Sequence, residues 1–262
     1  MCNPTCAAIA RRIAVIKIGG SVLTGAAAYQ RVAAAIAARV DETPATRFVV
    51  VVSAEQGTTD QLLADARSLT PDPDPSTVDL LWSTGELRAV ALLVLSLHAR
   101  GVRAVASNVH QTGLIDAGAP GAAGVTDFRA LRLRSQLADH DVVVAPGFLA
   151  RGAGDGIVSL GRGGSDLTAV RLAAGLGADV CELVKDVPGY FSSDPALDPG
   201  ACHLPTIDYD TALDMADRGC ELVQRRALEA AKDHRLPIVV RSIGSQTKTL
   251  VHDHVALKHD VT

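Results

Sequence analysis

Four short segments of the sequence combine glycine or hydroxyl residues with a charged side chain, each at the predicted end of a strand. They are the segment KIGGS at residues 17–21, residues 53–60, residues 160–166 and residues 185–190. Lysine and arginine side chains bind phosphate and carboxylate groups, and successive backbone N–H groups in a glycine-rich turn bind anions. Together these segments favour an anionic substrate and phosphate chemistry.

The first segment places Lys17 and two glycines directly after a predicted buried strand. Glycines here allow the backbone to approach a ligand closely, so Gly19 and Gly20 are candidate donors to phosphate, and Lys17 adds a positive charge. A strand-ending turn with a solvated lysine is the alternative. Neither G-x-x-x-x-G-K-[ST] nor G-x-G-x-x-G occurs in the sequence, so P-loop and dinucleotide-binding fingerprints are excluded.

The segment LGRGGSD at residues 160–166 is the most informative of the four. A guanidinium between glycines, followed by Ser165 and Asp166 at a probable helix start, combines a bidentate anion binder with an array of backbone donors. Helix capping by Ser165 or Asp166 is the alternative for those two residues. Capping does not account for Arg162 among its glycines.

The other two segments have structural explanations that remain open. In residues 53–60, Thr58, Thr59 or Asp60 would serve equally well as a helix N-cap. Residues 185–190, which include Lys185, form two turns in succession, and a surface loop is the plain alternative.

Continuous apolar runs predict the strands that position these segments. Residues 13–18, 48–52 and 142–145 are typical of strands buried on both faces of a parallel sheet. Helical stretches alternate with them, which indicates βαβ units. Helices are predicted at residues 29–40, 85–100, 166–176, 209–217 and 222–234, and further strands at residues 180–184 and 238–241. In an open parallel sheet the charged segments then meet at the carboxyl edge.

Three connecting regions are also predicted. Residues 68–75, rich in proline and aspartate, form a loop and the best internal boundary signal. Residues 108–127, rich in glycine and threonine, and the glycines of residues 152–156 indicate hairpins or turns outside the main sheet.

Composition narrows the function classes. The 262 residues are 48% hydrophobic and 21% charged, as in soluble globular proteins. With 25 basic and 29 acidic residues the formal charge is −4, no basic block stands out and aromatic residues make up 3%, so nucleic-acid binding lacks electrostatic and stacking support.

Cysteine usage and apolar patterning predict the location of the protein. The five cysteines are scattered without paired zinc spacing, and the histidines near the C-terminus lack HxxxH spacing. These features predict a reduced intracellular protein with solvated histidines and no residue assigned to a metal. The N-terminus lacks the order of a secretory signal, and no uninterrupted apolar run approaches the roughly 20 residues of a membrane span. We therefore expect a cytoplasmic protein without membrane contact.

Several motifs follow one another in a definite order and spacing: KIGGS, VVSAEQGTTDQLL, STGEL, APGFLA, SLGRGGSDLTAVRLAAGLGAD, KDVPGYFSSDP, the helix YDTALDMADRGCELVQRRALEAA and IVVRSI. Between about residues 13 and 251 this series resembles the catalytic domain of aspartate kinases, within the amino-acid kinase family. GRGGSD, its Ala-rich helix and the DVPGY element are the specific part of the resemblance.

The resemblance implies a single amino-acid kinase domain over residues 1–262. Its fold would be a three-layer α/β/α sandwich around a central, mostly parallel sheet. The N-terminal lobe, about residues 1–150, would hold the amino acid. The C-terminal lobe, about residues 151–262, would hold ATP.

The implied reaction transfers the γ-phosphoryl group of ATP, with Mg²⁺ bound through its phosphates, to the β-carboxylate of L-aspartate. A carboxylate is already ionised at neutral pH and needs no general base. Catalysis then consists of aligning two anions and neutralising charge on the moving group. Lys17 would neutralise that charge, Gly19 and Gly20 would donate N–H groups to the phosphates, and Asp166 would orient lysine side chains.

The resemblance also assigns the binding residues. Arg162 would clamp the α-carboxylate with Ser165 beside it, and Glu86 would pair with the α-ammonium. Among the remaining site residues, Ser53 and Thr59 would line the amino-acid pocket, and Lys185, Asp186, Tyr190 and Lys248 would lie along the nucleotide.

The sequence departs from the family pattern in three places. Ser21 and Val22 follow the glycines in place of Thr-Ser, and Gln224-Arg225 stands where His-Pro is usual. The chain also stops soon after the catalytic domain, so no ACT regulatory module is expected, and self-association would use the catalytic domain. A kinase of the same fold acting on another amino acid or small carboxylate is one alternative. A catalytically silent binding subunit is another.

Overall fold

A computed structural model of the protein describes residues 12–116, 125, 127–161 and 163–253. Its centre is an eight-stranded sheet with the order β12-β14-β13-β9-β1-β2-β6-β3. Neighbouring strands are parallel except β13 and β14. The strands are β1 (Arg12–Ile18), β2 (Thr46–Val52), β3 (Ala104–Ala106), β6 (Val142–Pro146), β9 (Cys181–Lys185), β12 (Thr206–Asp208), β13 (Ile238–Ser242) and β14 (Lys248–His252). The predicted, mostly parallel sheet is confirmed.

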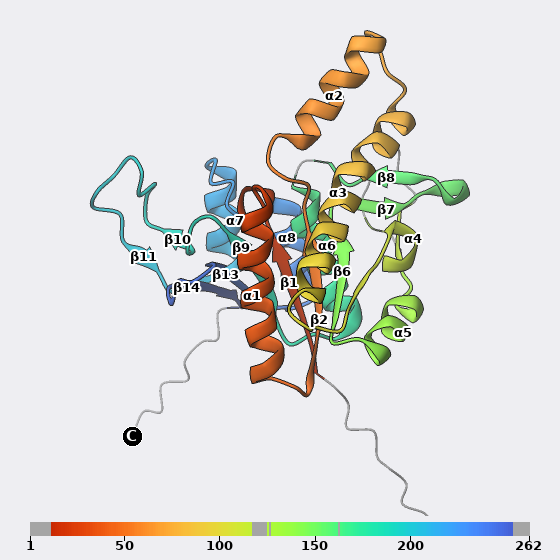
Figure 1. The fold of residues 1–262 in the computed structure, drawn as a ribbon. Helices are drawn as coiled ribbons and strands as arrows, with labels where there is room; N and C mark the ends of the chain where they lie inside the picture. The colour runs from red at the N-terminus through yellow and green to blue at the C-terminus, as the bar shows by residue number, and fades with distance from the viewer. Residues whose placement is uncertain (1–11, 117–124, 126, 162, 254–262) are drawn as a thin grey trace, which may run out of the picture.

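Helices cover both faces of this sheet (Figure 1). On one face, α1 (Ala26–Glu42) and α3 (Pro75–His98) pack in one core cluster with alternate residues of β1 and β2 such as Ile16 and Val50. The residues of β1 and β2 on the other face of the sheet, such as Val15 and Val49, pack in a second core cluster. Four helices contribute to that cluster: α5 (Leu131–Asp139), α6 (Gly164–Leu176), α7 (Tyr209–Asp217) and α8 (Arg225–Asp233). Because each central strand is buried on both sides, its apolar run is continuous. The result is the three-layer α/β/α sandwich.

The smaller elements lie outside the central sheet. A four-stranded sheet has the order β5-β4-β7-β8, and β10 and β11 form a separate pair. These elements are β4 (Leu114–Ile115), β5 (Asp127–Phe128), β7 (Leu149–Arg151), β8 (Ile157–Ser159), β10 (Tyr190–Phe191), β11 (His203–Leu204), α4 (Val109–Thr112) and the 3-10 turns η1 (Gly20–Val22) and η2 (Ala153–Asp155). The small sheet corresponds to the excursion expected around residues 108–127 and 152–156.

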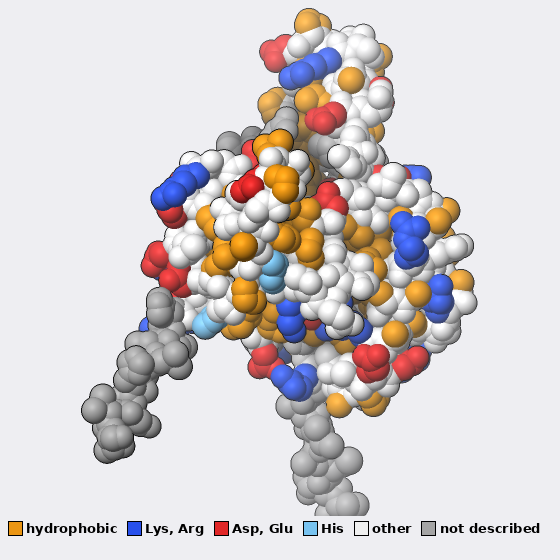
Figure 2. All heavy atoms as spheres, turned by 90° about the vertical axis from the view of Figure 1, so that its left-hand side faces the viewer, with side chains coloured by type: hydrophobic (Ala, Val, Ile, Leu, Met, Phe, Trp, Pro, Cys, Tyr) orange, Lys and Arg blue, Asp and Glu red, His pale blue; other side chains and the backbone are white. Residues whose placement is uncertain are grey.

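The region around residues 68–75 differs from the prediction. Helix α2 (Thr58–Leu69) ends just before a short turn, and α3 begins at Pro75, ten residues before its predicted start at 85. The Asp74 side chain accepts a hydrogen bond from the Thr77 N–H at 2.9 Å, and Pro75 occupies the first turn. Proline has no N–H to leave unpaired at that position. The predicted loop is thus present at residues 70–74, and only its last proline, Pro75, begins a helix earlier than expected. Helices α2 and α3 pack together as one projection of the domain (Figure 1 and Figure 2).

Helix α3 is long and apolar enough, by length and composition alone, to cross a membrane, with a mean hydropathy of 1.5. In this fold it packs against α1, β6 and β8. It also buries the acidic side chains Asp79 and Glu86. Such a helix is apolar on most sides because it lies between the sheet and other helices.

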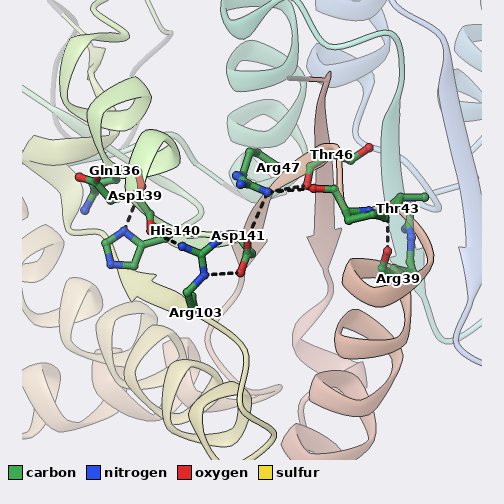
Figure 3. Close-up of polar contacts among 10 residues, drawn as sticks. Arg39, Thr43, Thr46, Arg47, Arg103, Gln136, Asp139, His140 and Asp141 are labelled. Atoms are coloured by element: carbon green, nitrogen blue, oxygen red, sulfur yellow. Dashed lines mark hydrogen bonds and ion pairs between the residues drawn. The ribbon is translucent and has the colours of Figure 1, made fainter. Parts of the chain in front are cut away.

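An ion cluster joins β2, β3 and β6 at the amino end of the parallel strands (Figure 3). Asp141 lies 3.0 Å from the Arg47 guanidinium and receives hydrogen bonds of 2.7 and 2.9 Å from Arg103. Arg47 is almost fully buried, whereas Arg103 is exposed. Loss of the carboxylate would break the ion pair of the buried Arg47, and breaking a buried pair typically costs about 3 kcal/mol or more. This cluster joins the strands at the amino edge of the sheet, opposite the carboxyl edge where the charged segments lie.

Candidate active site

Lys17 and Lys185 end two neighbouring strands, and both side chains reach the same carboxylate. Strands β1 and β9 are parallel, with Lys17 opposite Leu183 in the register. In α6, Asp166 accepts a hydrogen bond from Lys185 Nζ at 2.8 Å through Oδ2, and its Oδ1 lies 2.9 Å from Lys17 Nζ. The structure thus forms a buried Lys17–Asp166–Lys185 triad with two positive charges and one negative charge.

The start of helix α6 leaves Asp166 free to face the lysines. The N-cap is Gly163, with φ of 70°, and neither Ser165 nor Asp166 caps the helix. The capping alternative for these two residues is therefore wrong. Helix α2 likewise begins after Gly57, with φ of 82°, and not with a capping Thr58, Thr59 or Asp60. Only glycine adopts this left-handed conformation without strain.

The triad sets the protonation of its members. Burial by itself would raise the pKa of Asp166, but the Lys17 and Lys185 ammonium groups lower it from 3.8 to about 2. Burial and the neighbouring Lys17 lower the pKa of Lys185, although Asp166 opposes the shift. Asp166 is therefore an ionised group that orients two lysines, and it does not serve as a base at neutral pH.

The two glycines after β1 have different surroundings. The Gly19 N–H donates to the Val184 carbonyl oxygen at 3.1 Å, so it is already used by the backbone. A Cβ on Gly20 would collide with the Ala54 carbonyl oxygen. Among the described residues, the Gly20 N–H has no hydrogen-bond acceptor. The prediction that both N–H groups bind phosphate is thus corrected, because only the Gly20 N–H is free to bind a ligand. Gly19 instead forms the turn next to Lys17 Nζ.

Ser53 and Ser165 come together beside the β6–β7 turn. The Gly147 N–H donates to the Val52 carbonyl oxygen at 2.8 Å, directly before Ser53. A Cβ on Gly147 would lie 2.6 Å from the Ser165 Cβ, so the turn passes directly over that serine. Thr59 lies in the first turn of α2. The structure therefore brings Ser165 close to the end of β2, where Ser53 follows, and the rest of the amino-acid pocket stays a prediction.

Glu86 is a buried carboxyl group with an unused oxygen. Glu86 is 3% exposed, and its Oε2 has no hydrogen-bond partner among the described residues. Burial raises its pKa from 4.5 to about 8, against the opposing effects of the Ala54 N–H and Lys17. Because the unfolded chain loses this proton near pH 4.5, the protein without ligand loses stability as the pH rises from there towards 8. A cationic ligand group beside Oε2 would remove this penalty.

The residues predicted along the nucleotide fall into two groups. Asp186 and Lys248 are exposed at the carboxyl edge, where Lys248 lies opposite Arg241 at the start of β14. Tyr190 is 1% exposed and packs in the core, and among the described residues its hydroxyl has no hydrogen-bond partner. Its side chain is therefore part of the core, and its contact with the nucleotide stays a prediction.

Arg162 lies outside the described residues, but the positions that flank it are firmly held. Asp79, buried in α3, accepts a hydrogen bond from the Ser159 N–H at 3.0 Å. Arg226 donates to the Leu160 carbonyl oxygen at 2.9 Å.

The support by Asp79 was missed in the sequence, whereas Gln224 was noted there only as a departure from the family pattern. Asp79 is an acidic residue in an apolar stretch, seven positions before Glu86, and that signal was available. Gln224 lies against Gly163, where a Cβ would be 2.8 Å from the Gln224 Cγ. It occupies the position of the usual His-Pro and belongs to the loop support.

No group of three or more His, Cys, Asp or Glu side chains is placed to hold a metal ion within the ranges that the structure describes. The charged groups at the carboxyl edge include the triad, Glu86 and the exposed Asp186 and Lys248. A buried pair of lysines can bind phosphate oxygens, and a buried carboxylate can bind an ammonium group.

The amino-acid sequence is similar to those of several aspartokinases. The chain is 39% identical over 234 residues to the aspartokinase of Mycolicibacterium smegmatis, which covers 88% of this chain and 54% of that protein. The chain thus spans about half the length of such curated relatives.

Solved structures agree with the sequence comparison. Aspartate kinase from Synechocystis superposes with a TM-score of 0.82 at 36% identity, covering 92% of this chain and 40% of that chain. E. coli aspartokinase III in complex with aspartate and ADP gives a TM-score of 0.80 at 25% identity, covering 92% of this chain and 65% of that chain. The sequence pattern of the amino acid kinase family matches residues 12–242. The chain therefore belongs to the amino acid kinase family.

Proposed function

We propose that the protein transfers the γ-phosphoryl group of ATP to the side-chain carboxylate of L-aspartate. The observation that carries the proposal is the Lys17–Asp166–Lys185 triad, which aims two buried ammonium groups at the carboxyl edge of the sheet. The similarity to aspartokinases, one of them solved with aspartate and ADP, supports the choice of substrates.

In this proposal Lys17 and Lys185 bind the β- and γ-phosphate oxygens, and the free Gly20 N–H donates to the same phosphates. An oxygen of the acceptor carboxylate forms a bond to the γ-phosphorus while the bond from that phosphorus to the bridging oxygen of ADP breaks. The electron pair of the broken bond leaves with ADP. Lysines fixed by Asp166 neutralise the charge that develops, without reorganisation during the reaction.

The amino acid occupies the other side of the edge. Glu86 pairs with its α-ammonium through the unused Oε2, and Arg162, with Ser165 beside it, binds its α-carboxylate. Ser53 and Thr59 complete the pocket. An N-acylated substrate would leave the Glu86 carboxyl group without a partner, which favours a free amino acid.

The same proposal divides the chain into two functional halves. Residues up to about 150 hold the amino acid, and residues from about 151 to 262 hold ATP, with Lys185, Asp186 and Lys248 along the nucleotide. Mg²⁺ would be held through the ATP phosphates, because this ion keeps several waters and is commonly bound in that way. We propose a cytoplasmic location and self-association through this domain.

The decisive experiment measures ADP release with L-aspartate, L-glutamate, N-acetylglutamate and UMP as acceptors, while hydroxylamine traps any acyl phosphate. We expect turnover and trapped acyl phosphate with L-aspartate. Turnover with another acceptor alone would favour a related kinase of different specificity. Absence of turnover with all four would favour a binding subunit without catalytic activity.

The pH dependence of substrate binding tests the Glu86 assignment. The KM for the amino acid is expected to fall as the pH rises from about 6 to 8, by at most about tenfold per unit, because the α-ammonium binds only the ionised carboxylate. Initial rates measured over this pH range would give both KM values. The KM for ATP should stay flat, and Glu86→Gln should remove the dependence. An unchanged slope in Glu86→Gln would contradict the assignment.

A further inference from the structure

Trp82 is the one tryptophan in the sequence, and no role described above uses it. It lies in α3 one turn before Glu86 and is half-buried. Its indole Nε1 donates a hydrogen bond to the Thr59 carbonyl oxygen at 3.1 Å. Its ring meets the Phe148 ring edge to face, with centroids 5.6 Å apart and an interplanar angle of 64°. One side chain therefore contacts two separate segments beside the amino-acid pocket.

The hydrogen bond from Trp82 to Thr59 attaches helix α2, which makes few other contacts with the domain. Helix α2 has no fully buried residue and projects from the body of the domain (Figure 1 and Figure 2). Within the described part of the chain, the bond from Trp82 to Thr59 is the one hydrogen bond that joins α2 to another helix. Close approach of Thr58 to Gly85 adds packing at the same place, because a Cβ there would lie 3.0 Å from the Thr58 Cγ2.

The second contact reaches the β6–β7 turn, which packs against the start of α6. Phe148 has φ of 66°, a strained conformation for a residue other than glycine, which persists only when its surroundings enforce it. Its carbonyl oxygen accepts a hydrogen bond from the Leu160 N–H at 2.7 Å, and a Cβ on Gly164 would lie 3.3 Å from its Cδ2. Packing of Trp82 on Phe148 thus bears on the backbone at Leu160 and at Gly164.

We propose that Trp82 is a positioning residue for the acceptor: it holds Thr59 and the Phe148 turn in place around the amino acid bound at Glu86. This inference rests on the proposed function only in naming an amino acid as the ligand. Within the described residues, no hydrogen bond or ring contact joins Trp82 to the triad, so its influence should fall on the amino acid and not on ATP.

Two variants separate the contributions of the indole. Trp82→Phe keeps an aromatic ring but removes the N–H, and it should raise the KM for the amino acid about fivefold, the effect of one lost hydrogen bond. Trp82→Leu removes the ring pair as well, and a rise on the order of 30-fold is expected. In both variants the KM for ATP should change less than about twofold. Leu80→Ala, an exposed position on the same helix, is the matched control and should change neither KM.

Intrinsic fluorescence gives a direct readout, because all tryptophan emission comes from Trp82. Saturating amino acid should change the emission intensity or wavelength, and ATP alone should not. Equal increases in both KM values, or unchanged emission at an amino-acid concentration that supports full turnover, would overturn the proposal.

The inference and the proposed function can fail separately. If an acceptor other than L-aspartate is turned over, the same measurements apply to that acceptor. If none is turned over, amide hydrogen exchange in the unliganded protein tests the attachment of α2 alone. Trp82→Phe should then accelerate exchange in the first turns of α2 about fivefold, with α1 unchanged. Equal exchange in the variant and the original protein would overturn the positioning role.

Discussion

Replacement of Lys17 by methionine is expected to lower kcat on the order of 10³-fold, with both KM values changed much less. Methionine keeps the length of the side chain but removes the charge, which the proposed mechanism needs most when charge spreads over the moving phosphoryl group. Steady-state kinetics with both substrates varied would give the three parameters. Circular dichroism would show whether the variant is folded.

Lys232→Met provides a matched control. Lys232 lies in α8 and forms a surface ion pair with Asp210 at 2.5 Å. The kcat of the Lys232→Met variant should equal that of the original protein. A Lys17→Met protein that retained kcat within tenfold would remove Lys17 from the catalytic role, and a rise confined to the KM for ATP would reduce that role to binding.

Asp166→Asn should lower both stability and activity. The substitution keeps the size of the side chain but leaves two buried ammonium groups without a counter-ion, and we expect the free energy of unfolding to fall by about 3 kcal/mol at neutral pH. The released lysines repel each other and lose their orientation, so kcat should fall at least about 100-fold. Denaturant unfolding and initial rates on the same preparations would measure the two effects.

The contribution of Asp166 to the free energy of unfolding should decrease at low pH. The pKa of Asp166 is lowered from 3.8 to about 2 in the folded protein, so its contribution to stability is fully present above about pH 4 and is lost as the pH falls towards 2. The stability difference between Asp166→Asn and the original protein should shrink over that same window.

Asp141→Asn is the control for loss of a buried carboxylate. Asp141 bridges Arg47 and Arg103 at the opposite edge of the sheet (Figure 3). This variant should lose stability while its folded fraction keeps the original kcat. Equal loss of kcat in Asp141→Asn and Asp166→Asn would show that the activity effect follows from stability alone.

Much of the site follows from local sequence. The apolar runs in β1, β2 and β6 predict a parallel sheet, because only strands buried on both faces are apolar throughout. Once the sheet is parallel, segments that follow its strands share one edge. Lys17 and Lys185 are therefore neighbours by prediction, and the motifs shared with aspartate kinases add Asp166.

The errors of prediction have physical causes. The start of α3 was placed ten residues late because prolines in sequence favour loops, and only the Asp74 side chain, bonded to the Thr77 N–H, marks Pro75 as a first-turn residue. The resemblance to aspartate kinases placed Tyr190 along the nucleotide, and that prediction did not include its burial in the core. Its burial depends on the β10–β11 pair and on Thr249, which are remote in sequence.

The sequence by itself determined the sheet, the order of the motifs and which charged residues stand at its edge, because these depend on local apolar runs and on residue types. Only the tertiary structure decided that the two oxygens of Asp166 face Lys17 and Lys185 separately. It also decided that, among the described residues, Gly20 and not Gly19 keeps a free N–H and Glu86 Oε2 lacks a partner. Pairing and burial depend on contacts between distant segments, so these features could not be assigned from neighbouring residues alone.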